Sequence, residues 1–164
     1  MRKRITVFLM SLAIAGSFVS LGITVYRSIM FKQNCSGYLK QAADASTVQI
    51  AIDKLDIAIQ YLEDNNLTQG YTSIVYKTQD EDLGFWYNNI INAREQLKLS
   101  LNGSKLEQDN ALMRVREALL DNGEKGTELT IPDGISRYPY NLFFAITNTL
   151  SIIVLIVLSI AISA

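Results

Sequence analysis

The last stretch of this chain, residues 142–164 (LFFAITNTLSIIVLIVLSIAISA), contains no charged side chain. As a helix that rises ~1.5 Å per residue, it would extend roughly 35 Å, and the hydrocarbon core of a bilayer is about 30 Å thick. Backbone amides inside a bilayer must find hydrogen bonds within the protein, which an isolated span achieves only as a helix. The stretch therefore predicts a transmembrane helix over residues 141–164.

A second uncharged stretch covers residues 5–26, directly after the basic residues Arg2, Lys3 and Arg4. It predicts another transmembrane helix over residues 5–27, preceded by a basic tail over residues 1–4. The alternative is a cleaved signal peptide, because Ala13-Ile14-Ala15 resembles a cleavage site. Cleavage there would leave a short apolar core, and the apolar run continues well beyond Ala15. We therefore prefer an uncleaved signal-anchor.

The distribution of charge predicts the orientation of these helices. All 16 acidic residues lie between the two stretches, whereas the N-terminal tail carries only basic residues. Because cytoplasmic flanks are enriched in Lys and Arg, we expect both termini to be cytoplasmic and the middle segment to be exported. This layout predicts a multi-pass protein of the bacterial inner (plasma) membrane with a periplasmic or extracellular domain.

The middle segment reads as helices, with a domain over residues 28–123 and a connector rich in turns over 124–140. The first span is expected to continue over 28–45. Capping-box patterns at Ser46–Gln49 and Ser104–Glu107 predict helices over 47–64 and 105–121. Between them, acidic residues at 80–82 predict the start of a helix that ends near Leu101. Residues 71–79 are strand-like in composition, but they have no evident partner strand, so we expect an ordered extended loop.

Apolar spacing predicts which faces of these helices are buried. On the 47–64 helix, we expect one ridge from Val48 to Leu62 and a second ridge at Ile50 and Ile57, so that the helix is covered on two sides. On the 105–121 helix, the buried side chains are expected to be Leu112, Met113, the stem of Arg116, Leu119 and Leu120.

The predicted fold class is thus an all-α membrane protein, in which two transmembrane helices flank a small extracytoplasmic up-and-down helical domain of three to four helices. In layout alone, this arrangement resembles the helical sensor domains that lie between two spans in bacterial receptors. The resemblance implies ligand sensing, but the chain carries no recognisable signalling module.

Aromatic and acidic residues gather around one helix start and form a candidate ligand or partner face. The alternative is that Phe85 and Trp86 belong to the core while the acids cap the helix. The residues of this face are Tyr71, Tyr76, Asp80, Asp82, Phe85, Trp86 and Tyr87.

Small and polar residues in the two spans predict helix association. Gly16, Ser20 and Thr24 recur every four residues and so share one face of the first span. Asn148 places an amide about two turns inside the second, where polar groups commonly bond another helix. Pairing within one chain and pairing between chains are both open.

Residue types absent from the chain narrow its function. It has no histidine, so the commonest general base and metal ligand are missing, and its one cysteine, Cys35, cannot form an intramolecular disulfide. No catalytic, cofactor-binding or metal-binding motif and no basic stripe for nucleic acid is evident. We expect a non-enzymatic accessory or structural subunit, with the lipid bilayer and other membrane subunits or further copies of itself as partners. The alternative is a ligand-binding or sensory module around Trp86.

Overall fold

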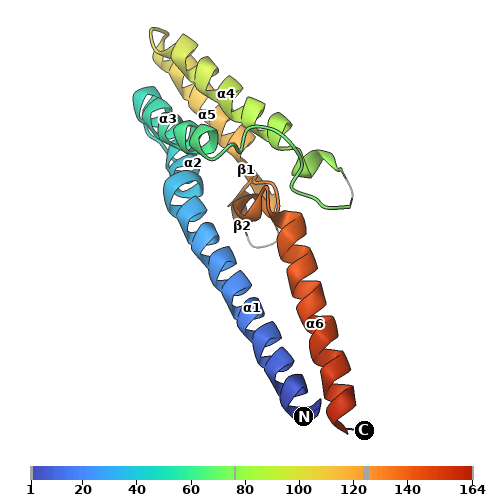
Figure 1. The fold of residues 1–164 in the computed structure, drawn as a ribbon. Helices are drawn as coiled ribbons and strands as arrows, with labels where there is room; N and C mark the ends of the chain where they lie inside the picture. Colours follow the sequence, from blue (N-terminus) through green and yellow to red (C-terminus); the bar gives the residue numbers. More distant parts are fainter. Residues whose placement is uncertain (1, 76, 124–125, 164) are drawn as a thin grey trace. The chain divides into compact units, whose positions relative to one another are not determined.

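The computed structural model describes residues 2–75, 77–123 and 126–163, and most of them are helical (Figure 1). The chain divides into two compact units: unit 1 comprises Met1–Ser28 and Ser136–Ala164, and unit 2 comprises Ile29–Ile135. The helices are α1 (Arg2–Phe31), α2 (Gly37–Ala43), α3 (Val48–Asp64), α4 (Leu83–Ser100), α5 (Lys105–Leu119) and α6 (Asn141–Ser163). A π-helical turn (Lys32–Ser36) joins α1 to α2, and 3-10 turns lie at Gln79–Glu81 and Ile135–Arg137.

Unit 1 consists of the helices α1 and α6 side by side and the turns that enter α6 (Figure 1). Most of their apolar side chains are exposed, as for Phe18 with 70% of its surface accessible and Phe143 with 62%. Among the described residues, one helix, within Val7–Ala43, is long and apolar enough to cross a membrane. The described apolar part of α6, Asn141–Val157, is shorter, and a second crossing by α6 stays a prediction.

Unit 2 has its core along α3, as the first apolar ridge predicts. Its buried side chains include Val48, Leu55 and Leu62, and α3 packs against both α2 and α4. The second ridge is a wrong prediction, because Ile50 and Ile57 are each 43% exposed.

Capping side chains fix where two of these helices begin. Ser104 and Glu107 form the predicted capping box: the Ser104 amide donates to the Glu107 carboxylate at 2.6 Å, and the Ser104 hydroxyl accepts from the Glu107 amide at 3.4 Å. The predicted box at Ser46 is wrong. Thr47 is the cap of α3 and accepts from the Ile50 amide at 3.3 Å.

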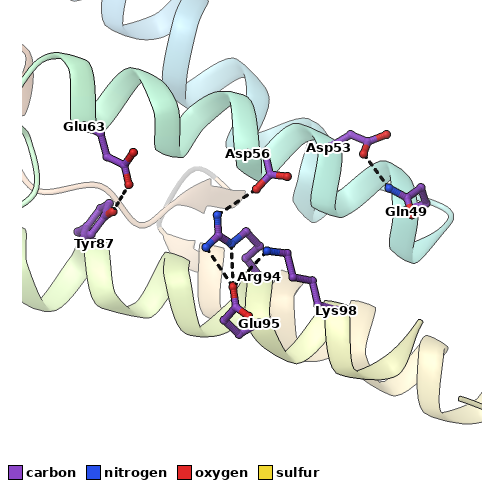
Figure 2. A network of polar contacts seen from close by, with 8 residues as sticks. All are labelled: Gln49, Asp53, Asp56, Glu63, Tyr87, Arg94, Glu95 and Lys98. Atoms are coloured by element: carbon purple, nitrogen blue, oxygen red, sulfur yellow. Dashed lines mark hydrogen bonds and ion pairs between the residues drawn. The ribbon is translucent and has the colours of Figure 1, made fainter. Parts of the chain in front are cut away.

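Polar contacts link α3 to α4 along their exposed edges (Figure 2). Arg94 of α4 donates to the Asp56 carboxylate of α3 at 3.1 Å, and Glu95 and Lys98 extend the same network along α4. Because its carboxylates lie near half exposure, the network is screened by water and contributes little stability.

The face of α5 that packs inward agrees with the prediction at Leu119, which is buried, and differs from it elsewhere. Ala111, Val115 and Leu119 are buried, four residues apart, whereas Met113 is 61% exposed and Arg116 pairs with Asp44 at 3.5 Å. The small Ala111 side chain suits a close approach to α4, which packs against this helix. The prediction gave weight to side-chain size, so it included Met113 and the stem of Arg116 and left out Ala111 and Val115.

The mostly helical structure is consistent with the predicted all-α class, but a two-stranded antiparallel hairpin, which was not predicted, follows α5. The helix ends at Leu119 instead of Asp121, and β1 (Leu120–Gly123) pairs with β2 (Gly126–Leu129). The predicted extended loop over 71–79 is free of strands among its described residues, apart from a single bridge between Tyr71 and Asp82.

Candidate functional site

Trp86 anchors α4 to the chain that follows the hairpin. Its side chain is buried, and the indole N–H donates to the Thr130 carbonyl at 2.7 Å. The Thr130 amide in turn donates to the carbonyl of Leu119, the last residue of α5, at 2.9 Å. Through these two hydrogen bonds, Thr130 contacts both α4 and α5. Trp86 therefore helps to fix the segment after the hairpin against the two helices.

A cavity of about 460 Å³ lies beside Trp86, and we call it the Trp86 pocket. Its inner wall includes the buried side chains of Trp86, Ile90 and Leu119. Exposed carboxylates of Asp80, Asp121 and Glu128 also line it. The cavity therefore combines an apolar interior with a rim of hydrogen-bond acceptors.

Three residues of the predicted aromatic and acidic face line this pocket: Asp80, Phe85 and Trp86. Trp86 is buried, as the core alternative expected, but Phe85 remains 61% exposed. Asp82 instead caps α4, because its carboxylate accepts from the Phe85 amide at 3.1 Å.

Two other aromatic residues of that face, Tyr71 and Tyr87, are not among the residues that line the pocket. The Tyr71 ring is covered by Lys77, whose ammonium lies 5.3 Å from the ring centroid. Tyr87 donates to the Glu63 carboxylate at 2.6 Å, on the α3 side of α4 (Figure 2). Partial burial, and then the hydrogen bond to Glu63, raise the pKa of Tyr87 to about 12. Tyr76 lies outside the described residues.

The pocket residues contributed by the hairpin were missed from the sequence. Asp121 and Glu128 are directly opposite each other in the β1–β2 register, and Thr130 follows β2. The available signal was Asn122-Gly123 followed by Gly126, since Asn-Gly and closely spaced glycines favour hairpin turns. Treating Leu119 and Leu120 as the buried end of a helix hid that signal.

A second site is the polar contact between α1 and α6. The hydroxyl of Ser20, which is buried, donates to the Asn148 side-chain oxygen at 3.2 Å. Thr24 donates to the Ser20 carbonyl at 2.9 Å within α1, so its hydroxyl is satisfied locally. Among the described residues, no neighbouring helix comes within 4 Å of a Cβ built on Gly16, so Gly16 is not a point of close helix approach there.

Gly16 instead lines an open, almost wholly apolar groove of about 480 Å³ between α1 and α6. Leu9 and Leu12 of α1 also line it, together with Val154 and Val157 of α6, and Ser151 adds a polar group. In a bilayer, such a groove can hold a lipid chain or a helix of another protein.

Arg27 ties the end of α1 to the segment that enters α6. Its Nε donates to the Ser136 carbonyl at 2.9 Å and its Nη2 donates to the Tyr138 carbonyl at 2.7 Å. The guanidinium also lies 5.2 Å from the Tyr140 ring centroid, within reach of a cation–π interaction. No local sequence pattern indicates these contacts, because the acceptors are backbone carbonyls far along the chain.

Comparison with models of known protein families, with curated proteins and with solved structures gives no match for this chain.

Proposed function

We propose that this chain is a two-span membrane protein, crossing with α1 and α6, that serves as an accessory or structural subunit of a larger membrane assembly or of an assembly of its own copies. In this proposal both termini are cytoplasmic, the middle domain is extracytoplasmic, and the chain performs no catalysis. The observation that carries the proposal is the polar contact between Ser20 and Asn148, set between two helices whose other side chains are mostly apolar and exposed.

Exposed apolar side chains on α1 and α6 suit a lipid environment better than water. Burying apolar surface away from water is worth roughly 25 cal/mol per Å², so leaving Phe18, Phe143 and their neighbours in water would be costly. In a bilayer, the same side chains meet lipid tails or partner helices without cost. Ser20 and Asn148, which the bilayer would disfavour, are bonded to each other.

Asn148 retains a further capacity to bind. Its side-chain oxygen accepts from Ser20, but its side chain is exposed, and its amide N–H donors have no partner in the part of the chain that the structure describes. An unsatisfied donor inside a bilayer costs free energy, which a partner helix can recover by supplying an acceptor. This supports association through α6.

The experiment that tests association replaces the amide in the full-length protein. We expect Asn148→Leu to shift the protein to its monomeric form in mild detergent, measured by light scattering combined with size-exclusion chromatography. Thr149→Val is the matched control, because it makes a similar polar-to-apolar change at the next exposed position of α6. Equal behaviour of the two variants and the wild type would contradict a role for Asn148 in association.

Orientation is tested separately with cysteines placed in the full chain after Cys35→Ala. We expect Lys105→Cys, at the exposed start of α5, to react with a membrane-impermeant maleimide in intact cells. We expect Lys3→Cys and Ala164→Cys to react only after the membrane is permeabilised. Labelling of only one terminus in intact cells would contradict two crossings.

A second candidate function, an extracytoplasmic ligand-binding or sensory module, is favoured by the Trp86 pocket. Its volume of about 460 Å³ falls within the range of roughly 300–1,000 Å³ typical of small-molecule sites. Trp86 is the only tryptophan in the chain, so its fluorescence reports directly on occupancy of the pocket. A change that saturates with added ligand is the expected result for this function.

A further inference from the structure

We infer that the Trp86 pocket binds a small organic cation that combines an ammonium or guanidinium group with an apolar body. This inference rests on the pocket being a binding site, the second function proposed above, and it adds the chemical class of the ligand. It is drawn from the charge of the lining, from its balance of donors and acceptors, and from its aromatic surface.

Charge is the first indication. Asp80, Asp121 and Glu128 line the pocket, and no Lys or Arg is among its described lining residues. These carboxylates come from two separate parts of unit 2, the turn before α4 and the hairpin. A concave surface lined by one sign of charge concentrates ligands of the opposite sign. The pocket therefore favours cations.

The register of the hairpin brings two of these carboxylates together. Asp121 and Glu128 are directly opposite each other on β1 and β2, which places their side chains on the same face of the hairpin. A cation at this face would therefore be attracted by carboxylates from both strands.

The balance of hydrogen-bonding groups points the same way. Ionised carboxylates only accept hydrogen bonds, and the Trp86 N–H already donates to Thr130. Gln79 and Asn89 contribute the amide groups of the lining. A ligand rich in donors, such as an ammonium or guanidinium ion, complements this surface, whereas a carboxylate or phosphate would meet repulsion.

Aromatic and apolar surface accounts for the body of the ligand. Phe85 keeps 61% of its surface exposed beside the pocket, an arrangement that suits contact with a cation or a flat apolar group. Ile90 and Leu119 extend the apolar surface inward. A simple inorganic cation would leave this surface unused, and we therefore infer an organic cation.

The test titrates three matched probes into the full-length protein in maltoside detergent, which carries no cationic headgroup. The probes are 2-phenylethylammonium, the neutral 2-phenylethanol and the anionic 3-phenylpropanoate. Trp86 fluorescence and isothermal calorimetry measure affinity. We expect the ammonium ion to bind at least about tenfold more tightly than the alcohol, through its added attraction to the rim carboxylates, and to weaken as salt is added.

Charge-removing variants locate the interaction. We expect Asp80→Asn and Glu128→Gln each to weaken binding of the ammonium ion by about fivefold and to leave binding of the alcohol unchanged. Glu117→Gln is the control, because it removes a carboxylate from α5 outside the pocket lining. Two independent positions keep the test decisive if one variant fails to fold, which circular dichroism would show.

The possible failures are distinguishable. If the alcohol binds as tightly as the ammonium ion, or if the anion binds more tightly, the inference of a cationic ligand is overturned while the pocket remains a binding site. If none of the three probes gives a saturable response, the cation inference is overturned and the ligand-binding function loses its support. Equal weakening by Glu117→Gln would show that the attraction is a general surface effect, and this too would overturn the inference.

Discussion

At the scale of single residues, burial of Cys35 is expected to protect its thiol from reagents. It lies in the π-helical turn after α1 and has no exposed surface. We predict that it reacts with N-ethylmaleimide on the order of a hundredfold more slowly in the native protein than in urea, because labelling must wait for local opening. Mass spectrometry of the labelled protein measures both rates.

A non-reducing gel tests the alternative role of a lone cysteine, which is a disulfide between two copies of the chain. A disulfide between two copies would need Cys35 to reach the surface, so we expect the native protein to run as a single chain on a non-reducing gel. Rapid native labelling, or a dimer that dithiothreitol abolishes, would contradict the buried role.

Glu107 gives a pH-dependent prediction. The hydrogen bond from the Ser104 amide, and then the one from the Ser104 hydroxyl, lower the pKa of Glu107 in the folded protein. A lowered pKa contributes stability that is present above the unfolded value of about 4.3 and is lost as the pH falls through the folded value. We predict that Glu107→Gln unfolds at lower urea concentration than the wild type at pH 7, and that the difference shrinks towards pH 3.

Trp86 fluorescence follows this unfolding in the full-length protein in detergent. Glu117→Gln removes a carboxylate from the same helix away from the cap, and therefore shows the effect of charge alone. A Glu107→Gln difference that stays constant between pH 7 and pH 3 would show that the charged capping interaction is not its cause.

Residue-scale prediction from sequence succeeded where the interaction is local. The cap at Ser104 depends on a partner three residues away, so its pattern is visible in the sequence. Tyr87 was misplaced because its partner, Glu63, lies on another helix. The contacts of Arg27 could not be predicted, because its acceptors are carbonyl groups more than one hundred residues later.

At the scale of elements, Arg27 joins α1 to the turns that lead into α6. We predict that Arg27→Met accelerates amide hydrogen exchange across residues 136–140 by about tenfold or more, because hydrogen bonds to charged groups contribute roughly 1.5–3 kcal/mol and two are lost. Exchange in α3 should not change. Exchange measured by mass spectrometry on the full-length protein gives both values.

Lys32→Met is the matched control for this variant, because Lys32 is exposed and lies in the π-helical turn just beyond α1. The change removes the same charge without touching the Arg27 contacts. Similar exchange over residues 136–140 in the two variants would contradict the anchoring role of Arg27.

Sequence patterns predicted helices better than they predicted which faces are buried. The α3 ridge from Val48 to Leu62 follows a strong apolar period, and its burial is confirmed. In α5, the period is weak and the buried stripe contains Ala111, so size misled the prediction. The hairpin was missed because its strands are only four residues each, and short strands carry little periodic signal.

The candidate pocket shows the same limit at a larger scale. Asp80, Phe85 and Trp86 are close in sequence and were predicted together. Asp121 and Glu128 reach the pocket only through the pairing of β1 with β2, which no pattern around Trp86 could indicate. Local sequence therefore predicted one side of the pocket, and tertiary packing supplied the other.

At the scale of the whole molecule, the long apolar stretch near the N-terminus has the length and composition of a membrane span. Crossing by α6 and assembly with other subunits are the central claims of the proposed function. Both depend on surfaces that only a membrane and a partner would cover: the exposed apolar faces of α1 and α6, the groove beside Gly16, and the amide of Asn148.

The most direct test extracts the protein from its native membrane into nanodiscs and determines the mass of the particle's protein content. We predict a discrete assembly heavier than the 18.3 kDa monomer. It would contain several copies of the chain, or the chain and another membrane protein in a fixed ratio. The Asn148→Leu variant should be extracted as the monomer. A wild-type protein that is extracted only as an 18.3 kDa monomer with no companion would contradict the account.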